Sequence, residues 1–184
     1  MGKVYDAIDD RLAEFLTAQK VFFVATAPLA GDGHLNLSPK GLDSFRVLGP
    51  RTVAYQDFIG SGIETVAHLR ENGRIVILFC AFDGAPKLVR LYGTGRSVEP
   101  CDPDFAELLA QFPERRTTRS IVRVQIDRVS DSCGYGVPLY RFEGERSQLD
   151  DWAARKGDED LDRYKRENNA TSIDGLPGLR RGES

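Results

Sequence analysis

The chain has 184 residues, the length of one domain or of one domain with an extension. Hydrophobic residues make up 41%, and a net charge of −3 arises from charges of both signs that are mixed along the sequence. Without a basic block or a long apolar run, we expect no nucleic-acid partner and no membrane partner. The three cysteines lie far apart, which indicates reduced thiols in a cytoplasmic protein and no metal site.

The first part of the chain is predicted to form a helix followed by short strands. Apolar residues at helical spacing predict an amphipathic helix over residues 6–19. A run of bulky apolar residues predicts a strand over residues 21–27, and a turn rich in glycine leads into a second strand over residues 34–38. Pro39 is expected to end this strand. Residues 52–57 are predicted to form a third strand.

A glycine-bearing turn follows the third strand and is the most informative stretch of the sequence. Ser61 and Glu64 have the spacing of a capping box, which predicts a helix from about residue 63 to residue 72. Gly73 then stands where helices commonly end. The first N–H groups of a helix lack intrahelical partners, so the turn Gly60–Gly62 can hold a phosphate. The same pattern also fits an ordinary helix cap without a ligand.

The second part of the chain contains three more predicted strands. Strands are expected over residues 74–82 and 87–98, a short helix over residues 105–112, and a sixth strand with one wet face over residues 121–129. Turns rather than helices join most neighbouring strands. This order favours a mainly β (α+β) fold, a six-stranded antiparallel barrel with flanking helices and a helical C-terminal tail.

The composition becomes polar and charged after the last predicted strand. We therefore expect a barrel domain over residues 1–139 and a helical or irregular C-terminal extension over residues 140–184. Within the extension, Ser147 is expected to cap one helix, and a second charged helix follows at about residues 159–168. Trp152 is expected to anchor the extension to the barrel or to a partner chain.

Several motifs carry a resemblance to one protein family. NLSPKG at residues 36–41, DFIGSGIETVAHLRENGRI at residues 57–75 and the pair VILFCAF and LVRLYGTGRSVE resemble the pyridoxamine 5′-phosphate oxidase-like family of FMN-binding split β-barrels. SCGYGVP at residues 132–138 and ATSIDGLPGL at residues 170–179 resemble one bacterial branch of that family, for which the resemblance implies no reaction. The resemblance covers roughly residues 5–179.

The resemblance implies a homodimer that holds FMN at its two-fold interface. The FMN phosphate is expected at the second and third strands and at the start of the following helix. Oxidases that act on pyridoxamine phosphate carry an Arg-Lys pair there, whereas this chain has Ile63, Glu64 and Thr65. We therefore do not expect the vitamer oxidase activity. The aromatic ring in SCGYGVP is a candidate to stack on the flavin or on the substrate. The expected cofactor-binding residues are Ser38, Lys40, Asp57, Gly60, Ser61, Gly62, Thr65 and Tyr135.

Other candidate residues have simpler interpretations. Lys40 also fits a solvated turn lysine. Cys133 has no histidine or asparagine near it in the sequence, which favours a packing role over a nucleophile. His34 and His68 lie on different elements and are not expected to be catalytic. No helix follows the glycines at residues 93–95, so they do not form a dinucleotide-binding fingerprint.

Two functional classes remain open from the sequence. The first is an FMN-dependent oxidoreductase acting on an unknown small molecule, with a nicotinamide cofactor as a candidate reductant. In such an enzyme the cofactor carries the electron chemistry, so no catalytic side chain needs to be recognisable. The alternative is a non-catalytic split barrel that stores or senses flavin, or that binds haem.

Overall fold

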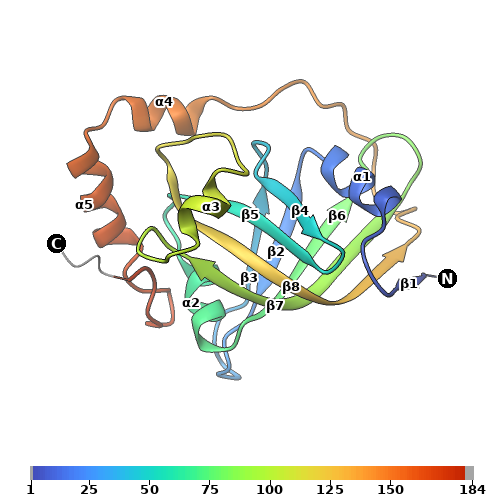
Figure 1. Cartoon of the computed structure of the whole chain (residues 1–184), viewed down its shortest axis with the longest axis horizontal. Coiled ribbons are helices and arrows are strands. Elements are labelled where there is room, and N and C mark those ends of the chain that lie inside the picture. The colour runs from blue at the N-terminus through green and yellow to red at the C-terminus, as the bar shows by residue number, and fades with distance from the viewer. Residues whose placement is uncertain (1, 181–184) are drawn as a thin grey trace.

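The computed structural model of the chain describes residues 2–180, with a coiled antiparallel sheet flanked by helices (Figure 1). The first residue of the predicted barrel domain and residues 181–184 of the predicted extension lie outside the described residues. The strands are β1 (Val4–Tyr5), β2 (Phe22–Thr26), β3 (Asn36–Lys40), β4 (Phe45–Gly49), β5 (Thr52–Phe58), β6 (Arg74–Cys80), β7 (Leu88–Val98) and β8 (Thr118–Ser132). The helices are α1 (Asp10–Ala18), α2 (Glu64–Glu71), α3 (Phe105–Leu109), α4 (Gln148–Ala154) and α5 (Asp158–Asn168).

Over residues 2–180 the sheet has eight strands rather than the predicted six. The strands lie in the order β3-β2-β6-β7-β8-β5-β4, and β1 pairs with the end of β8. The two strands that the sequence did not predict are β1, with two residues, and β4, with five. In β4, Phe45 and Val47 face the core. Two alternating apolar residues are too short a sequence pattern to distinguish a strand from a loop. The outer strands β3 and β4 do not pair with each other, so the barrel is split there.

Strand β3 continues through the proline that was expected to end it. Pro39 is tolerated because β3 lies at an edge of the sheet, where a missing N–H does not interrupt a ladder on both sides. Because side chains alternate along a strand, Asn36, Ser38 and Lys40 face the split. Leu37 and Pro39 face outward and are exposed.

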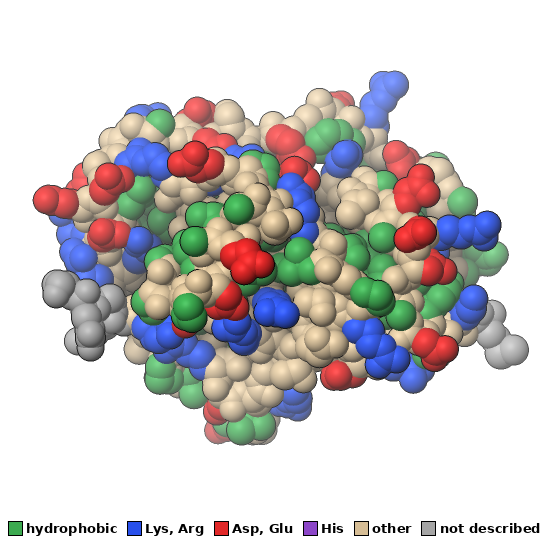
Figure 2. Space-filling model, viewed as in Figure 1, with side chains coloured by type: hydrophobic (Ala, Val, Ile, Leu, Met, Phe, Trp, Pro, Cys, Tyr) green, Lys and Arg blue, Asp and Glu red, His purple; other side chains and the backbone are tan. Residues whose placement is uncertain are grey.

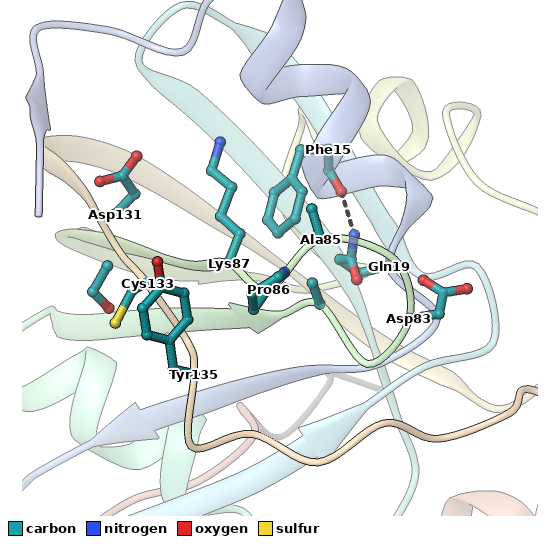
Figure 3. A pocket seen from close by; sticks show the side chains of 11 residues that line it. Phe15, Gln19, Asp83, Ala85, Pro86, Lys87, Asp131, Cys133 and Tyr135 are labelled. Carbon is teal, nitrogen blue, oxygen red and sulfur yellow. Dashed lines mark hydrogen bonds between the residues drawn. The ribbon is translucent and has the colours of Figure 1, made fainter.

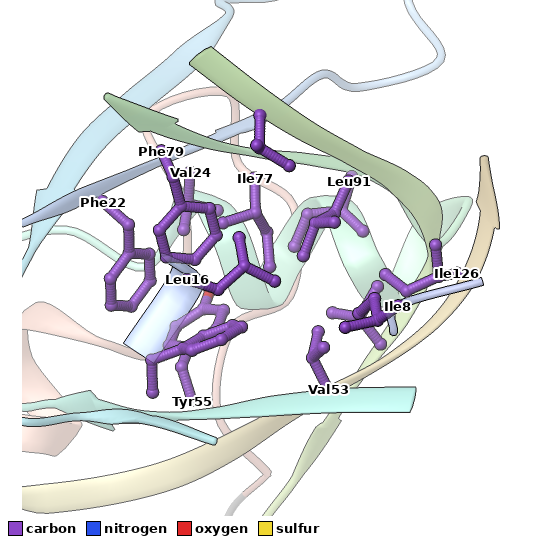
Figure 4. Close-up of a cluster of buried hydrophobic side chains, with 14 of the residues drawn as sticks. Ile8, Leu16, Phe22, Val24, Val53, Tyr55, Ile77, Phe79, Leu91 and Ile126 are labelled. Atoms are coloured by element: carbon purple, nitrogen blue, oxygen red, sulfur yellow. The ribbon is translucent and has the colours of Figure 1, made fainter. Parts of the chain in front are cut away.

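One large apolar cluster fills the inside of the coiled sheet (Figure 4). Four aromatic rings meet in it, with centroid distances between 4.8 and 5.6 Å. Phe22 of β2 contacts Tyr55 of β5 across the interior, so this cluster joins strands that are not neighbours in the sheet. Leu16 of α1 is buried against the same cluster and closes one end of the barrel.

The C-terminal extension packs on the barrel of its own chain. After β8 the chain runs across the molecule to α4 and α5, and residues 169–180 then return to the start of α2 (Figure 1). Trp152 of α4 contacts Tyr164 of α5, with ring centroids 5.1 Å apart, beside the buried Ile59 at the end of β5. This places the extension against the turn that the sequence singles out.

The surface carries charges of both signs. Lys, Arg, Asp and Glu side chains are interspersed over the face seen in Figure 2. Within residues 2–180, none of the helices has the length and apolar character needed to cross a membrane. Over the same residues, no group of three or more His, Cys, Asp and Glu side chains is placed to hold a metal ion.

Candidate functional site

The predicted phosphate turn lies between β5 and α2, beside the split in the barrel. Helix α2 begins after Ile63, and no side chain caps its start. The predicted capping box is therefore wrong. Ser61 is exposed, while the Glu64 carboxylate lies against Gly62 and accepts a hydrogen bond from the Ile173 N–H at 3.3 Å. The first N–H groups of α2 thus carry no side-chain cap from the described residues.

Asp57 is the electrostatic centre of this region. It is fully buried, with Oδ1 3.2 Å from Lys40 Nζ and Oδ2 2.7 Å from Arg119 Nε. Burial opposes its ionisation, but the Arg119 and Lys40 cations outweigh burial, so the pKa of Asp57 lies below its usual value. Arg119 also donates from Nη1 to the carbonyl oxygen of Gly62 at 2.7 Å. Around Asp57 itself two cations face one carboxylate, while the Glu64 carboxylate lies at the turn.

A chain of hydrogen bonds supports the first turn of α2 from behind. Asn36 Nδ2 donates to Thr65 Oγ1 at 2.9 Å and to Thr26 Oγ1 at 3.1 Å. Thr26 Oγ1 lies 2.9 Å from Nδ1 of His68, which is fully buried. Burial lowers the pKa of His68, so its imidazole is neutral near pH 7. This series of hydrogen bonds therefore links β2, β3 and α2 through neutral side chains.

Three buried polar atoms near the split have no hydrogen-bond partner among the described residues. They are Ser38 Oγ, Tyr55 Oη and His68 Nε2. Burial raises the pKa of Tyr55 well above its usual value, so its phenol keeps the proton. Buried polar groups are nearly always paired in folded proteins. Unpaired groups beside a surplus cation indicate that water or a polar ligand belongs here.

The C-terminal segment, residues 169–180, forms the outer wall of the turn. Asn169 is fully buried, and its Nδ2 donates to the carbonyl oxygen of Gly60 at 2.8 Å. Gly178 passes so close to Ile63 that an added Cβ would lie 2.9 Å from that side chain. The turn is therefore held from both sides, by this segment and by Arg119.

The structure does not bring Tyr135 to the other predicted residues within one chain. Asp57 pairs with Ser120 near the start of β8, whereas Tyr135 follows the opposite end of that strand and is 81% exposed. Tyr135 lines a separate cavity of about 660 Å³ together with Cys133 and Lys87 (Figure 3). Its contact with a flavin remains a prediction.

Some residues of this site were missed from the sequence. Alternation along β3 could have found Asn36, which lies two positions before Ser38 on the same face. No sequence signal places Arg119, because its contact with Asp57 depends on the register between two distant strands. The missed residues are Asn36, Tyr55, Arg119 and Asn169.

Comparison with known proteins assigns the chain to a family. The family model described as pyridoxamine 5′-phosphate oxidase matches residues 8–133. The chain belongs to this family. The pyridoxamine 5′-phosphate oxidase family protein ustO of Aspergillus flavus is 37% identical over 194 residues, which cover 95% of this chain and 77% of that protein. Since this relative is fungal, the likeness is not confined to bacteria.

Solved structures of other proteins share the fold. A variant of HupZ from Group A Streptococcus has a TM-score of 0.52 at 19% identity, covering 68% of this chain and 99% of that chain. A candidate pyridoxamine 5′-phosphate oxidase of Lactobacillus delbrueckii has a TM-score of 0.51 at 19% identity, covering 68% and 94%. At this identity the likeness shows the fold alone. The predicted antiparallel split barrel with flanking helices is thereby confirmed.

Proposed function

We propose that this member of the pyridoxamine 5′-phosphate oxidase family binds FMN at the split of its barrel and acts as an oxidoreductase on a small molecule. The observation that carries the proposal is the surplus positive charge around Asp57, beside the uncapped start of α2. A bound flavin supplies hydride and single-electron chemistry, and the protein supplies placement and electrostatics. We propose a nicotinamide cofactor as the reductant.

Lys40 is the proposed main contact of the FMN phosphate. Its side chain is 18% exposed at the edge of the split. Because Arg119 contacts the other carboxylate oxygen of Asp57, Lys40 can turn toward a phosphate without leaving Asp57 unpaired. The N–H groups at the start of α2 and the Thr65 hydroxyl would add neutral donors, as at other helix starts that bind anions. In the same proposal Ser38 and the turn Gly60–Gly62 line the phosphate.

The turn argues against pyridoxamine 5′-phosphate as the substrate. Glu64 and Thr65 stand where the resemblance implies a basic pair in the vitamer oxidases, and the Glu64 carboxylate lies against Gly62. Because the FMN phosphate is proposed at this same turn, the missing basic pair counts against the vitamer, and repulsion by Glu64 does not. We therefore propose a substrate other than this vitamer.

The outer face of the sheet supports the proposed homodimer. Leu37, Ala25, Val76 and Tyr92 are cross-strand neighbours in one row over β3, β2, β6 and β7. In the single chain, 70% of Leu37 and 39% of Tyr92 are exposed. Exposed apolar patches of this kind mark interaction surfaces. Because β3 also carries Lys40, a partner on this face would lie next to the proposed flavin site.

Comparing FMN with riboflavin tests the proposal, because riboflavin lacks the phosphate. We expect Lys40→Ala to raise the Kd for FMN about ten- to a hundredfold, the equivalent of one charge-assisted hydrogen bond of about 1.5–3 kcal/mol. The affinity for riboflavin should stay unchanged. Lys87→Ala is the matched control, since Lys87 lies at the separate cavity with its Nζ 4.9 Å from the Phe15 ring centroid. Loss of FMN affinity in Lys87→Ala alone would place the flavin in that cavity instead.

A further inference from the structure

The direction of the hydrogen bonds behind α2 decides what the Thr65 hydroxyl can do. An amide nitrogen only donates, so Asn36 Nδ2 makes Thr65 Oγ1 an acceptor. The hydrogen of the Thr65 hydroxyl is then left for another acceptor. Among the described residues, no hydrogen bond of normal geometry has Thr65 Oγ1 as its donor, and the buried Tyr55 phenol is the neighbouring group that competes for this hydrogen. Thr65 stands in the first turn of α2, where the proposed phosphate would lie.

The same reasoning applies to the buried end of this hydrogen-bond network, at Thr26 and His68. Thr26 Oγ1 also accepts from Asn36, so its own hydrogen can go to Nδ1 of His68. In that arrangement His68 carries its proton on Nε2, which has no partner among the described residues. If His68 instead donated from Nδ1, the Thr26 hydrogen and the Nε2 lone pair would both be unpaired. Each additional unpaired buried group is costly, so the first arrangement is favoured.

Rotating the Asn36 side-chain amide by half a turn would reverse the direction of these hydrogen bonds. Its oxygen would then accept from both threonines, and the Thr65 hydrogen would be consumed inside the protein. Thr26 would in turn accept from Nδ1–H of His68. The two directions therefore differ in the tautomer of His68 as well as in the availability of the Thr65 hydrogen. The assignment with Nδ2 toward both threonines is the direction that leaves the Thr65 hydrogen available, and the tautomer of His68 reports which direction holds.

We propose that Thr26 and Asn36 are positioning residues that hold the Thr65 hydroxyl with its hydrogen free to be donated to the flavin phosphate. This inference rests on the proposed function. It gives the chain a neutral donor at a helix start that lacks a basic pair and carries Glu64. Thr26 is buried, so it acts only through its neighbours. Its removal can therefore test positioning without removing a direct ligand contact.

The experiment measures the Kd for FMN and for riboflavin in Thr26→Val, with Thr26→Ser as the control that keeps the hydroxyl. We expect the FMN Kd of Thr26→Val to rise about three- to tenfold, as for the loss of one neutral hydrogen bond, with riboflavin affinity unchanged. Thr26→Ser should bind both flavins as the unaltered protein does. Equal losses for both flavins would show a merely structural role and overturn the inference.

A double-mutant cycle tests whether Thr26 acts through Thr65. If it does, Thr26→Val combined with Thr65→Val should lose no more FMN affinity than Thr65→Val alone. Additive losses would overturn the inference. Absence of FMN binding by the unaltered protein would overturn the proposed function and this inference with it, whereas FMN binding with an unchanged FMN-to-riboflavin ratio in Thr26→Val would overturn the inference alone.

The tautomer of His68 gives a measurement that needs no ligand and no variant. Nitrogen-15 chemical shifts of the imidazole distinguish a proton on Nε2 from one on Nδ1. We expect the Nε2–H tautomer near neutral pH. The Nδ1–H tautomer would show that the chain runs in the opposite direction, with the Thr65 hydrogen already used, and would overturn the inference.

Discussion

At the scale of single residues, the stability of the protein depends on the cations that neutralise one buried carboxylate. Asp57 is fully buried, and of its two cationic partners Arg119 is the more deeply buried, with a side chain 5% exposed against 18% for Lys40. Removing one partner of a buried ion pair leaves the other charge buried without a partner. The resulting loss of stability is larger than the stability that the intact pair contributes. We therefore expect the two cations to have separable roles, Arg119 in stability and Lys40 in the proposed binding of the flavin phosphate.

Replacing Arg119 by Met should destabilise the protein by about 3 kcal/mol, the lower end for a broken buried pair because Lys40 remains. Arg123→Met is the control, since Arg123 is half-exposed on the same strand and its pair with Asp104 is a surface contact at 3.9 Å. That change should cost less than about 1 kcal/mol. Urea unfolding measures both. Equal destabilisation in the two variants would show that the buried Asp57 carboxylate does not depend on Arg119 for its stabilisation.

The pH dependence of this difference follows from Asp57. Its folded pKa lies below its unfolded pKa, so the ion pair contributes stability above about pH 4 and loses it as the pH falls through the folded pKa. The loss in unfolding free energy caused by Arg119→Met should therefore be largest at pH 7 and become smaller below about pH 4. A cost that stays constant between pH 7 and pH 3 would point to lost packing rather than to charge.

At the scale of elements, the C-terminal segment 169–180 holds the turn before α2. It contacts Gly60 through Asn169, and Asp174 pairs with His34 in the β2–β3 connection at 2.6 Å. This segment is distant in sequence from both elements that it contacts. The turn therefore takes its shape from the end of the chain as well as from its own glycines.

Gly178→Ala tests this role of the segment. An added Cβ would lie 2.3 Å from the carbonyl oxygen of Asn169 and 2.9 Å from Ile63, so backbone or side chain must shift, at about 1–3 kcal/mol. We expect a Tm lower by several degrees and faster amide exchange at residues 60–62. Gly136→Ala is the control, because a Cβ there meets nothing within 4 Å. Unchanged exchange in Gly178→Ala would show that the segment does not order the turn.

The elements that the sequence predicted well are those with a strong local signal. Helix α2 was predicted within one residue at each end, and Gly73 has the positive φ of 71° that a glycine after a helix often adopts. Strand β4 and the continuation of β3 past Pro39 were not predicted, because they depend on a place at the sheet edge. The capping box failed because Glu64 contacts the distant C-terminal segment.

The site was predictable only where the resemblance to the family supplied its residues. Lys40, Asp57 and the Gly60–Gly62 turn lie on β3, on β5 and just after β5, and the structure brings them together. Arg119 comes from β8, whose register no local pattern specifies. Tyr135 was expected beside them, but β8 has 15 residues and carries it to the far end of the barrel.

At the scale of the whole molecule, the proposed dimer makes a direct prediction about mass. One chain is 20.5 kDa, so a homodimer has twice that, about 41 kDa. Leu37→Asp places a charge at a side chain that is 70% exposed in the single chain, so the fold should survive while the apolar row is interrupted. Light scattering should report about 41 kDa for the unaltered protein and a lower mass for Leu37→Asp. A folded monomer of the unaltered protein at micromolar concentration would rule out the dimer.

The identity of the small molecule that the purified protein releases on denaturation tests the central claim most directly. The net positive charge around Asp57, the uncapped start of α2 and the family membership together lead us to expect FMN, with a flavin absorption spectrum before release and a phosphate-bearing flavin in the released fraction. Protein that releases no ligand should take up added FMN and not lose it to an equal concentration of riboflavin. Release of haem, or failure to bind added FMN, would contradict the proposal.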